Sequence, residues 1–113
     1  MPPRDWRFRI RNILDAAGRI GSYTADLTRD EFSADSMLQE AVSYNLIIIG
    51  EAAAALPEDI ISRHPDIPWP LMRGMRNVLA HRYYAAEAEV IWQTASQDLP
   101  PLVEALGDII DSE

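Results

Sequence analysis

Apolar residues in the first part of the chain recur every three or four positions, the interval at which side chains share one face of an α-helix. Arginines and aspartates occupy many of the positions between them. We therefore expect an amphipathic helix from about Asp5 to Thr28. Its buried stripe would consist of Trp6, Ile10, Ile13, Ala17, Ile20 and Leu27.

The next segment is apolar on nearly every face. It leads through Val42 and Tyr44 into the run Leu46–Ile49, and Gly50-Glu51 and four alanines follow. Ser33 suits an N-cap, and the carboxylate of Asp35 in the first turn would interact favourably with the positive end of the helix dipole. We expect the central, most buried helix here, beginning near Ala34 and ending before Pro57.

Prolines divide the middle of the chain. The segment 57–65 predicts a connector that contains a short helix, because Pro65, Pro68 and Pro70 confine the residues that follow to an extended or kinked path. Proline fits the first turn of a helix, where its missing N–H is not needed. A third helix is therefore expected from Pro68–Pro70 to about His81 or Tyr83.

The last apolar pattern runs from Ala86 to Asp111, and Pro100-Pro101 interrupts it. This predicts two consecutive helices or one kinked helix, with Asp98 as a possible cap. The sequence contains no long alternating strand pattern, no hairpin signal and no internal repeat. The expected fold class is all-α, a bundle of four to five helices in a single domain, residues 1–113.

Composition narrows the range of functions. The chain has no cysteine and only two histidines, far apart, so we expect no metal and no cofactor. The longest apolar run is too short for a bilayer and the start lacks a signal peptide's apolar stretch, which predicts a cytoplasmic protein without a membrane partner. The formal net charge is −8, and all ten basic residues are arginine. Such a negative net charge argues against nucleic-acid binding through many cationic contacts with phosphates.

The segment Arg76-Asn77-Val78-Leu79-Ala80-His81-Arg82-Tyr83 carries the best candidate chemistry. On a helix, Asn77 and His81 would be neighbours on one face, and Arg76 and Tyr83 would align two turns apart. Arg73 lies one turn before Asn77. A histidine can move a proton near neutral pH, and an arginine can hold a phosphate by two charge-assisted hydrogen bonds, so this surface suits phosphodiester chemistry.

The same residue types also have structural interpretations. A histidine near a helix C-terminus is often a surface or capping residue, and an Arg-Asn pair in mid-helix is often only solvated. Glu51 follows an apolar run in the central helix, so we expect it to pair with an arginine, perhaps Arg76. Trp69 and Trp92 are expected to anchor the core or a dimer interface, and His64 to lie at the surface.

The spacing Arg-x4-His-x-Tyr, formed by Arg76, His81 and Tyr83, resembles the signature of HepT-like toxins of the HEPN superfamily. Asn77 matches the residue that usually follows the arginine. Further blocks resemble the family in order and spacing: Ile49-Gly50-Glu51-Ala52-Ala53, Pro65-Asp66-Ile67-Pro68-Trp69, Gly74-Met75-Arg76-Asn77 and Asp98-Leu99-Pro100. The resemblance implies an antiparallel helical bundle that pairs as a homodimer, with the motif helices of both subunits across a composite cleft.

For activity, the resemblance implies metal-independent cleavage of RNA by an endonuclease. His81 would act as general acid or base on the attacking 2′-hydroxyl or the leaving oxygen, and Arg76 would stabilise phosphate charge. Asn77 would orient the phosphate or His81. Arg73, Arg76 and Arg82 from both chains would make a local positive cleft on an otherwise acidic particle.

The resemblance also implies a partner, a small nucleotidyltransferase antitoxin of the MntA type. Such an enzyme can transfer AMP onto the motif tyrosine, here Tyr83, and the added charge beside Arg76 and His81 would block RNA binding. The alternative for Tyr83 is an aromatic tip packed near the helix end. The alternative for the whole chain is a non-catalytic HEPN subunit that serves a nucleotidyltransferase as a scaffold or nucleotide-binding partner, which the acidic composition favours.

Overall fold

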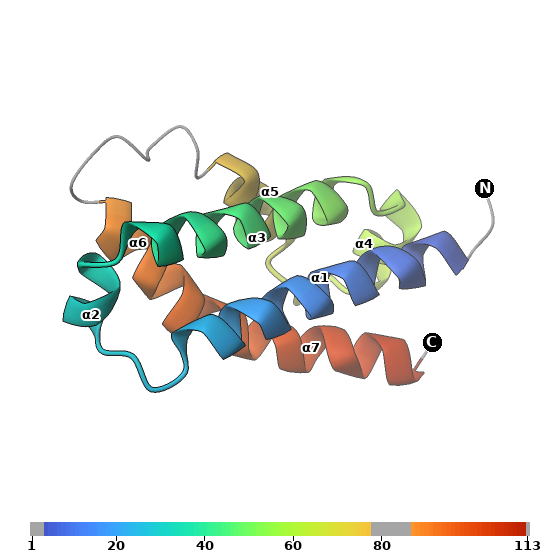
Figure 1. Cartoon of the computed structure of the whole chain (residues 1–113). Helices are drawn as coiled ribbons and strands as arrows, with labels where there is room; N and C mark the ends of the chain where they lie inside the picture. The colour runs from blue at the N-terminus through green and yellow to red at the C-terminus, as the bar shows by residue number, and fades with distance from the viewer. Residues whose placement is uncertain (1–3, 78–86, 113) are drawn as a thin grey trace.

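The computed structural model describes residues 4–77 and 87–112, with side chains described from Trp6 and from Ala88 onward (Figure 1). In these two ranges all regular structure is helical and no strand occurs, which confirms the all-α class. The elements are α1 (Arg4–Thr24), α2 (Arg29–Ser33), α3 (Ser36–Ala54), α4 (Glu58–Arg63), α5 (Trp69–Gly74), α6 (Glu87–Gln93), a π-helical turn η2 (Thr94–Asp98) and α7 (Leu99–Ser112).

Three long helical segments run lengthwise through the bundle: α1, α3 and the continuous α6–η2–α7 segment (Figure 1). The short helices α2 and α4 lie at opposite ends. Burying each large aliphatic side chain between the segments contributes about 1.5–3 kcal/mol. The fully enclosed side chains include Ile10, Ile13, Ile20, Phe32, Val42, Leu46, Ile49, Ile60, Met72 and Leu106.

A polar contact fixes the alignment of α1 against α3. Arg19 donates from Nε to the Asn45 Oδ1 atom at 2.8 Å, and Asn45 donates from Nδ2 to the Ala41 carbonyl at 2.9 Å. The Asn45 side chain is therefore buried with both ends of its amide bonded. This contact joins the C-terminal part of α1 to the middle of α3. Because the two helices run in opposite directions, the N-terminal part of α1 lies beside the C-terminal part of α3 (Figure 1).

The region between α1 and α3 differs from the sequence prediction. The first helix ends at Thr24 and not at Thr28, because Asp26 adopts a left-handed conformation (φ 64°) that an α-helix cannot continue through. Thr28 then starts α2 with a capping box, in which its hydroxyl accepts from the Glu31 N–H at 3.1 Å and its own N–H donates to Glu31 at 2.9 Å.

Helix α3 begins two residues later than expected. Its N-cap is Asp35, whose carboxylate accepts from the Leu38 N–H at 3.0 Å, while Ser33 belongs to α2. Asp35 was expected inside the first turn, and the prediction of Ser33 as the cap was wrong. Ser33 and Asp35 each have a side-chain oxygen that can accept from the unpaired N–H groups of the first turn. The sequence alone therefore could not decide which of them is the N-cap.

The chain around Pro100-Pro101 forms one continuous helical segment that contains a π-helical turn. The Leu99 N–H bonds to the Thr94 carbonyl, five residues back, and α7 then begins with both prolines in its first turn. Their missing N–H groups are not needed at those positions. Of the two expected alternatives, the structure favours a single interrupted helix. Within residues 4–77 and 87–112, no helix is both long and apolar enough to cross a bilayer.

Candidate functional site

The connector between α4 and α5 places the start of the predicted motif on the core. Trp69 is buried and donates from its indole Nε1 to the His64 carbonyl at 3.0 Å, which closes the proline-rich loop. Met72 and Met75 are also buried, so they hold α5 and the residues after it against α3. The expectation of Trp69 as a core anchor is confirmed. Trp92 is half-buried, and its ring lies 5.3 Å from that of Phe32.

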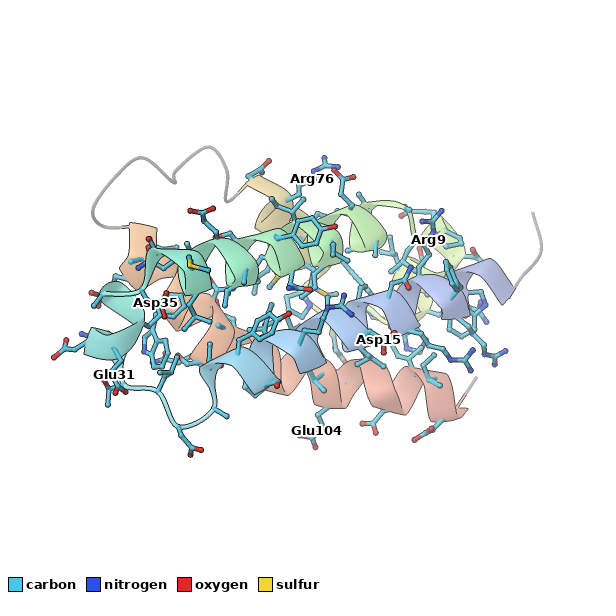
Figure 2. All side chains as sticks on the ribbon, in the orientation of Figure 1. Arg9, Asp15, Glu31, Asp35, Arg76 and Glu104 are labelled. Carbon is cyan, nitrogen blue, oxygen red and sulfur yellow. The ribbon has the colours of Figure 1, made fainter. Side chains whose placement is uncertain are left out.

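The motif arginine lies in a tight turn. The α-helical part of α5 ends at Gly74, and residues 75–77 form a 3-10 turn, with the Met75 N–H bonded to the Met72 carbonyl. The prediction of an uninterrupted α-helix through Arg76 and Asn77 was therefore wrong. Both side chains are exposed, as Figure 2 shows for Arg76 at the edge of the molecule. A guanidinium in this position is available to a phosphate from solvent.

Gly50 of α3 determines how closely this turn approaches the central helix. A Cβ atom at position 50 would overlap the Arg76 backbone nitrogen and would lie 2.7 Å from its Cβ and 3.0 Å from its Cα. The backbone of Arg76 therefore packs directly on the backbone of α3, where any side chain would push it away. Sequence reasoning did not assign this role to Gly50. The available signal was a glycine inside an otherwise apolar helix, which often marks a close backbone approach.

Arg73 precedes this turn on α5 and has an unsatisfied group. Its Nε atom is buried, and it has no hydrogen-bond partner in the described part of the protein. A buried donor on a charged group costs free energy until an acceptor reaches it. Gly74, the next residue, is exposed and has open space around the position of its missing Cβ. Gly74 thus has no side chain that would block the approach to Arg73 or Arg76.

His81 and Tyr83 lie outside the described residues, so the expected pairs Asn77–His81 and Arg76–Tyr83 stay predictions. Arg82 lies there too. The structure brings together Arg73, Arg76 and Asn77, which come from one helix end and the turn that follows it.

The expected pairing of Glu51 with Arg76 does not occur. Glu51 is exposed and forms no ion pair with a residue whose side chain the structure describes. The expected burial was wrong because α3 is not buried on all sides: its outer face reaches solvent, so the carboxylate keeps its hydration. Glu51 therefore adds a negative charge to the exposed face of α3, one residue from Gly50.

The two arginines lie outside the hollow next to the connector. This hollow of about 330 Å³ lies between the connector and α7, and its lining includes Asp66, Ile67, Leu71 and Leu102 but neither Arg73 nor Arg76. Arg76 is exposed instead. Because ligands are held best where they are largely enclosed, an exposed arginine needs further groups around it before it can bind a reacting group tightly.

Comparisons with known proteins identify the family of the chain. The family model described as ribonuclease HepT-like matches residues 13–109. A Methanocaldococcus jannaschii protein named as a putative RNase is 37% identical over 110 residues, which cover 97% of this chain and 91% of that protein. A Thermococcus cleftensis protein, "Probable ribonuclease HepT", is 37% identical over 93 residues, 82% of this chain and 84% of that protein. No solved structure matches. The chain belongs to the ribonuclease HepT-like family, within the HEPN class.

Proposed function

We propose that the chain is a metal-independent RNA endonuclease, the toxin of a toxin–antitoxin pair of the HepT/MntA type. The observation that carries the proposal is the arrangement of two cations at the start of the family motif. Arg76 is exposed on a turn that packs backbone-to-backbone against Gly50, and the half-buried Arg73 precedes it by three residues. A phosphodiester group is an acceptor that both guanidinium groups would bind.

The chemistry needs only proton transfer and charge stabilisation. The 2′-oxygen of the RNA loses its proton and attacks phosphorus, the bond from phosphorus to the 5′-oxygen breaks, and the leaving oxygen gains a proton. His81 serves as acid or base in these transfers, and Arg76 stabilises the charge that develops on the phosphate oxygens. Asn77 orients the phosphate or the imidazole. Arg73 holds the phosphate in place.

The proposal includes a homodimer, because Arg76 is exposed and a second copy could supply groups that enclose it. The outer face of α3 carries apolar residues as well as the charge of Glu51: Met37 is 82% exposed, Tyr44 is 66% exposed, and Ile47 and Ile48 are half-buried. Exposed apolar residues that gather on one face can mark association surfaces. A second copy on this face would cover them and bring its own motif toward Arg76.

The regulatory part of the proposal concerns Tyr83. We expect a nucleotidyltransferase antitoxin to transfer AMP from ATP onto its hydroxyl, with release of pyrophosphate, and thereby to add negative charge beside the arginines. After incubation with that enzyme, ATP and magnesium, the intact mass should rise by one or more AMP units in wild type and should not change in Tyr83→Phe. An equal increase in Tyr83→Phe would place the modification on another residue.

A second function is favoured by one observation, the net charge of −8 on a chain without lysine. In this case the protein is a non-catalytic HEPN subunit that binds a nucleotidyltransferase as a scaffold or nucleotide-binding partner. The two functions differ in their dependence on His81, since a scaffold needs no proton-transferring group.

The test is expression of the chain alone in bacteria, wild type beside His81→Ala. We expect growth arrest and loss of intact total RNA only in the wild type, because removing a general acid or base costs about 10²–10⁴-fold in rate. Unimpaired growth with intact RNA in both strains would support the scaffold function. Growth arrest by both variants with equal RNA loss would refute the role of His81.

A further inference from the structure

The charges of the protein are distributed very unevenly along the chain. Residues 4–20 hold five of the ten arginines and two aspartates, which gives them a formal charge of +3. Because the net charge of the whole chain is −8, all the other residues together carry −11. The positive residues belong to α1, and most of them precede its middle. A polyanion approaching this acidic particle would therefore meet a favourable potential at the N-terminal half of α1.

An exposed aromatic ring lies among these cations. Phe8 is 61% exposed, although burying a phenylalanine is usually favourable. At about 100° per residue, Phe8 lies between Arg11 and Arg9 around the helix. Neither Arg9 nor Arg11 forms an ion pair with a residue that the structure describes. Arginines beside an exposed aromatic ring are typical of sites that bind single-stranded nucleic acid. The arginines bind the phosphates, and a base stacks on the ring.

The adjacent turn of α1 is built rigidly. Trp6 is buried and the guanidinium of Arg7 stacks over its ring, with 4.7 Å from the Arg7 Cζ atom to the ring centroid. Such stacking of a cation on an aromatic face restricts the conformation of the arginine. The start of α1 therefore presents its cationic surface from a fixed backbone, which lowers the entropy cost of binding.

The basic part of α1 and the proposed catalytic turn lie against the same helix, α3. Helices α1 and α3 run in opposite directions (Figure 1), so residues 7–11 lie toward the C-terminal end of α3, and Gly50, which contacts Arg76, is in that half of the helix. In Figure 2 Arg9 lies at the edge of α1 away from α7. An RNA strand that leaves the site at Arg76 would pass the C-terminal end of α3 to reach these residues.

We infer that Phe8, Arg9 and Arg11 form an RNA-binding arm, a second contact that holds single-stranded RNA a few nucleotides away from the bond that is cut. The inference rests on the proposed ribonuclease function and adds the form of the substrate to it. Arg9 and Arg11 bind backbone phosphates, and Phe8 stacks on a base. The arm explains how an acidic protein captures RNA: local charge, not net charge, determines where the polyanion binds.

Binding can be measured without cleavage. The full-length His81→Ala protein is titrated with a fluorescently labelled single-stranded RNA of about 20 nucleotides at several salt concentrations. The double variant Arg9→Gln/Arg11→Gln should flatten the slope of log affinity against log salt by about 1.4, because each phosphate contact contributes about 0.7 in single strands. Phe8→Ala should weaken binding about 5- to 150-fold, the range for one stacked base.

Matched controls remove the same charge or a similar apolar group elsewhere. Arg29→Gln/Arg63→Gln removes two exposed, ion-paired arginines of α2 and α4, and Val103→Ala truncates an exposed residue of α7. These variants should bind RNA within about twofold of the parent, since they touch no phosphate or base in this account. If the double variant of α1 loses no more affinity than the Arg29/Arg63 control, net charge alone explains binding and the arm does not exist.

Cleavage by the active protein separates the arm from the catalytic proposal. The α1 variants should raise KM for the long RNA and leave kcat unchanged, and they should cleave a dinucleotide as wild type does, because it cannot span both contacts. A wild type that binds RNA through α1 but cuts nothing would refute the ribonuclease and keep the arm. A wild type that cleaves while the α1 variants behave as the controls, or lose only binding to an acidic partner protein, would refute the arm.

Discussion

Gly50→Ala is expected to remove most of the RNA-cleaving activity and to destabilise the fold, although it adds only one methyl group. The new Cβ would occupy space taken by the Arg76 backbone, with 2.7 Å to the Arg76 Cβ and 3.0 Å to its Cα. Backbone atoms cannot rotate away as a flexible side chain could, so the turn or α3 must shift. Such overpacking costs about 1–3 kcal/mol, and a 1 Å displacement of a catalytic group can cost about 100-fold in rate.

The control for this prediction is Gly18→Ala. Gly18 is an exposed residue of α1 with open space around its missing Cβ, so alanine there should raise the free energy of unfolding by up to about 1 kcal/mol through helix propensity. Thermal unfolding and RNA cleavage are measured for both variants. We expect a lower Tm and weak cleavage for Gly50→Ala, and an equal or higher Tm with normal cleavage for Gly18→Ala. Normal cleavage by Gly50→Ala would show that the contact does not position Arg76.

The second large effect is expected for Arg76→Ala. Its guanidinium is exposed and has no ion pair in the described part of the protein, so its loss should leave the Tm within a few degrees of wild type. Removing a group that stabilises developing charge typically costs about 10²–10³-fold in kcat. Arg76→Lys should recover part of the rate, because lysine keeps the charge but cannot bind a phosphate through two parallel hydrogen bonds. An unchanged kcat in Arg76→Ala would exclude this residue from the reaction.

The proposed dimer allows a sharper version of the same measurement. Arg76→Ala and His81→Ala chains, each inactive alone, are mixed under conditions that exchange subunits. If one chain supplies the arginine and the other the histidine, mixed dimers contain one intact site and recover up to half of the wild-type activity. Recovery would establish the composite site. No recovery with proven subunit exchange would mean that both residues act from the same chain.

Periodicity was sufficient to predict the helices that contain the core. The apolar stripe of α1 and the apolar length of α3 place Ile10, Ile13, Leu46 and Ile49 inside, and all four are buried. Local capping was harder to predict, because Thr28, Ser33 and Asp35 are all good N-cap residues within eight positions. Which of them caps a helix depends on where Asp26 ends α1 and how Phe32 packs into the core, which are tertiary effects.

The candidate site was predictable in residue type but not in geometry. The spacing of Arg73, Arg76 and Asn77 indicated a cationic surface, and His81 indicated proton transfer near neutral pH. The 3-10 turn at residues 75–77 and its contact with Gly50 could not be predicted, because they depend on two segments that meet backbone to backbone although Gly50 and Arg76 are 26 residues apart in the sequence. Glu51 shows the converse error: burial inferred from neighbouring isoleucines did not hold for a residue on the outer face of α3.

The most direct test of the account is RNA cleavage by the purified full-length protein, with wild type and His81→Ala compared in the presence of EDTA. The account predicts that wild type converts a defined RNA into fragments that end in 2′,3′-cyclic phosphate or its hydrolysis product. His81→Ala, with an unchanged melting temperature, should be at least about 100-fold slower. Equal cleavage by both proteins, or no cleavage by a folded and dimeric wild type, would contradict the account.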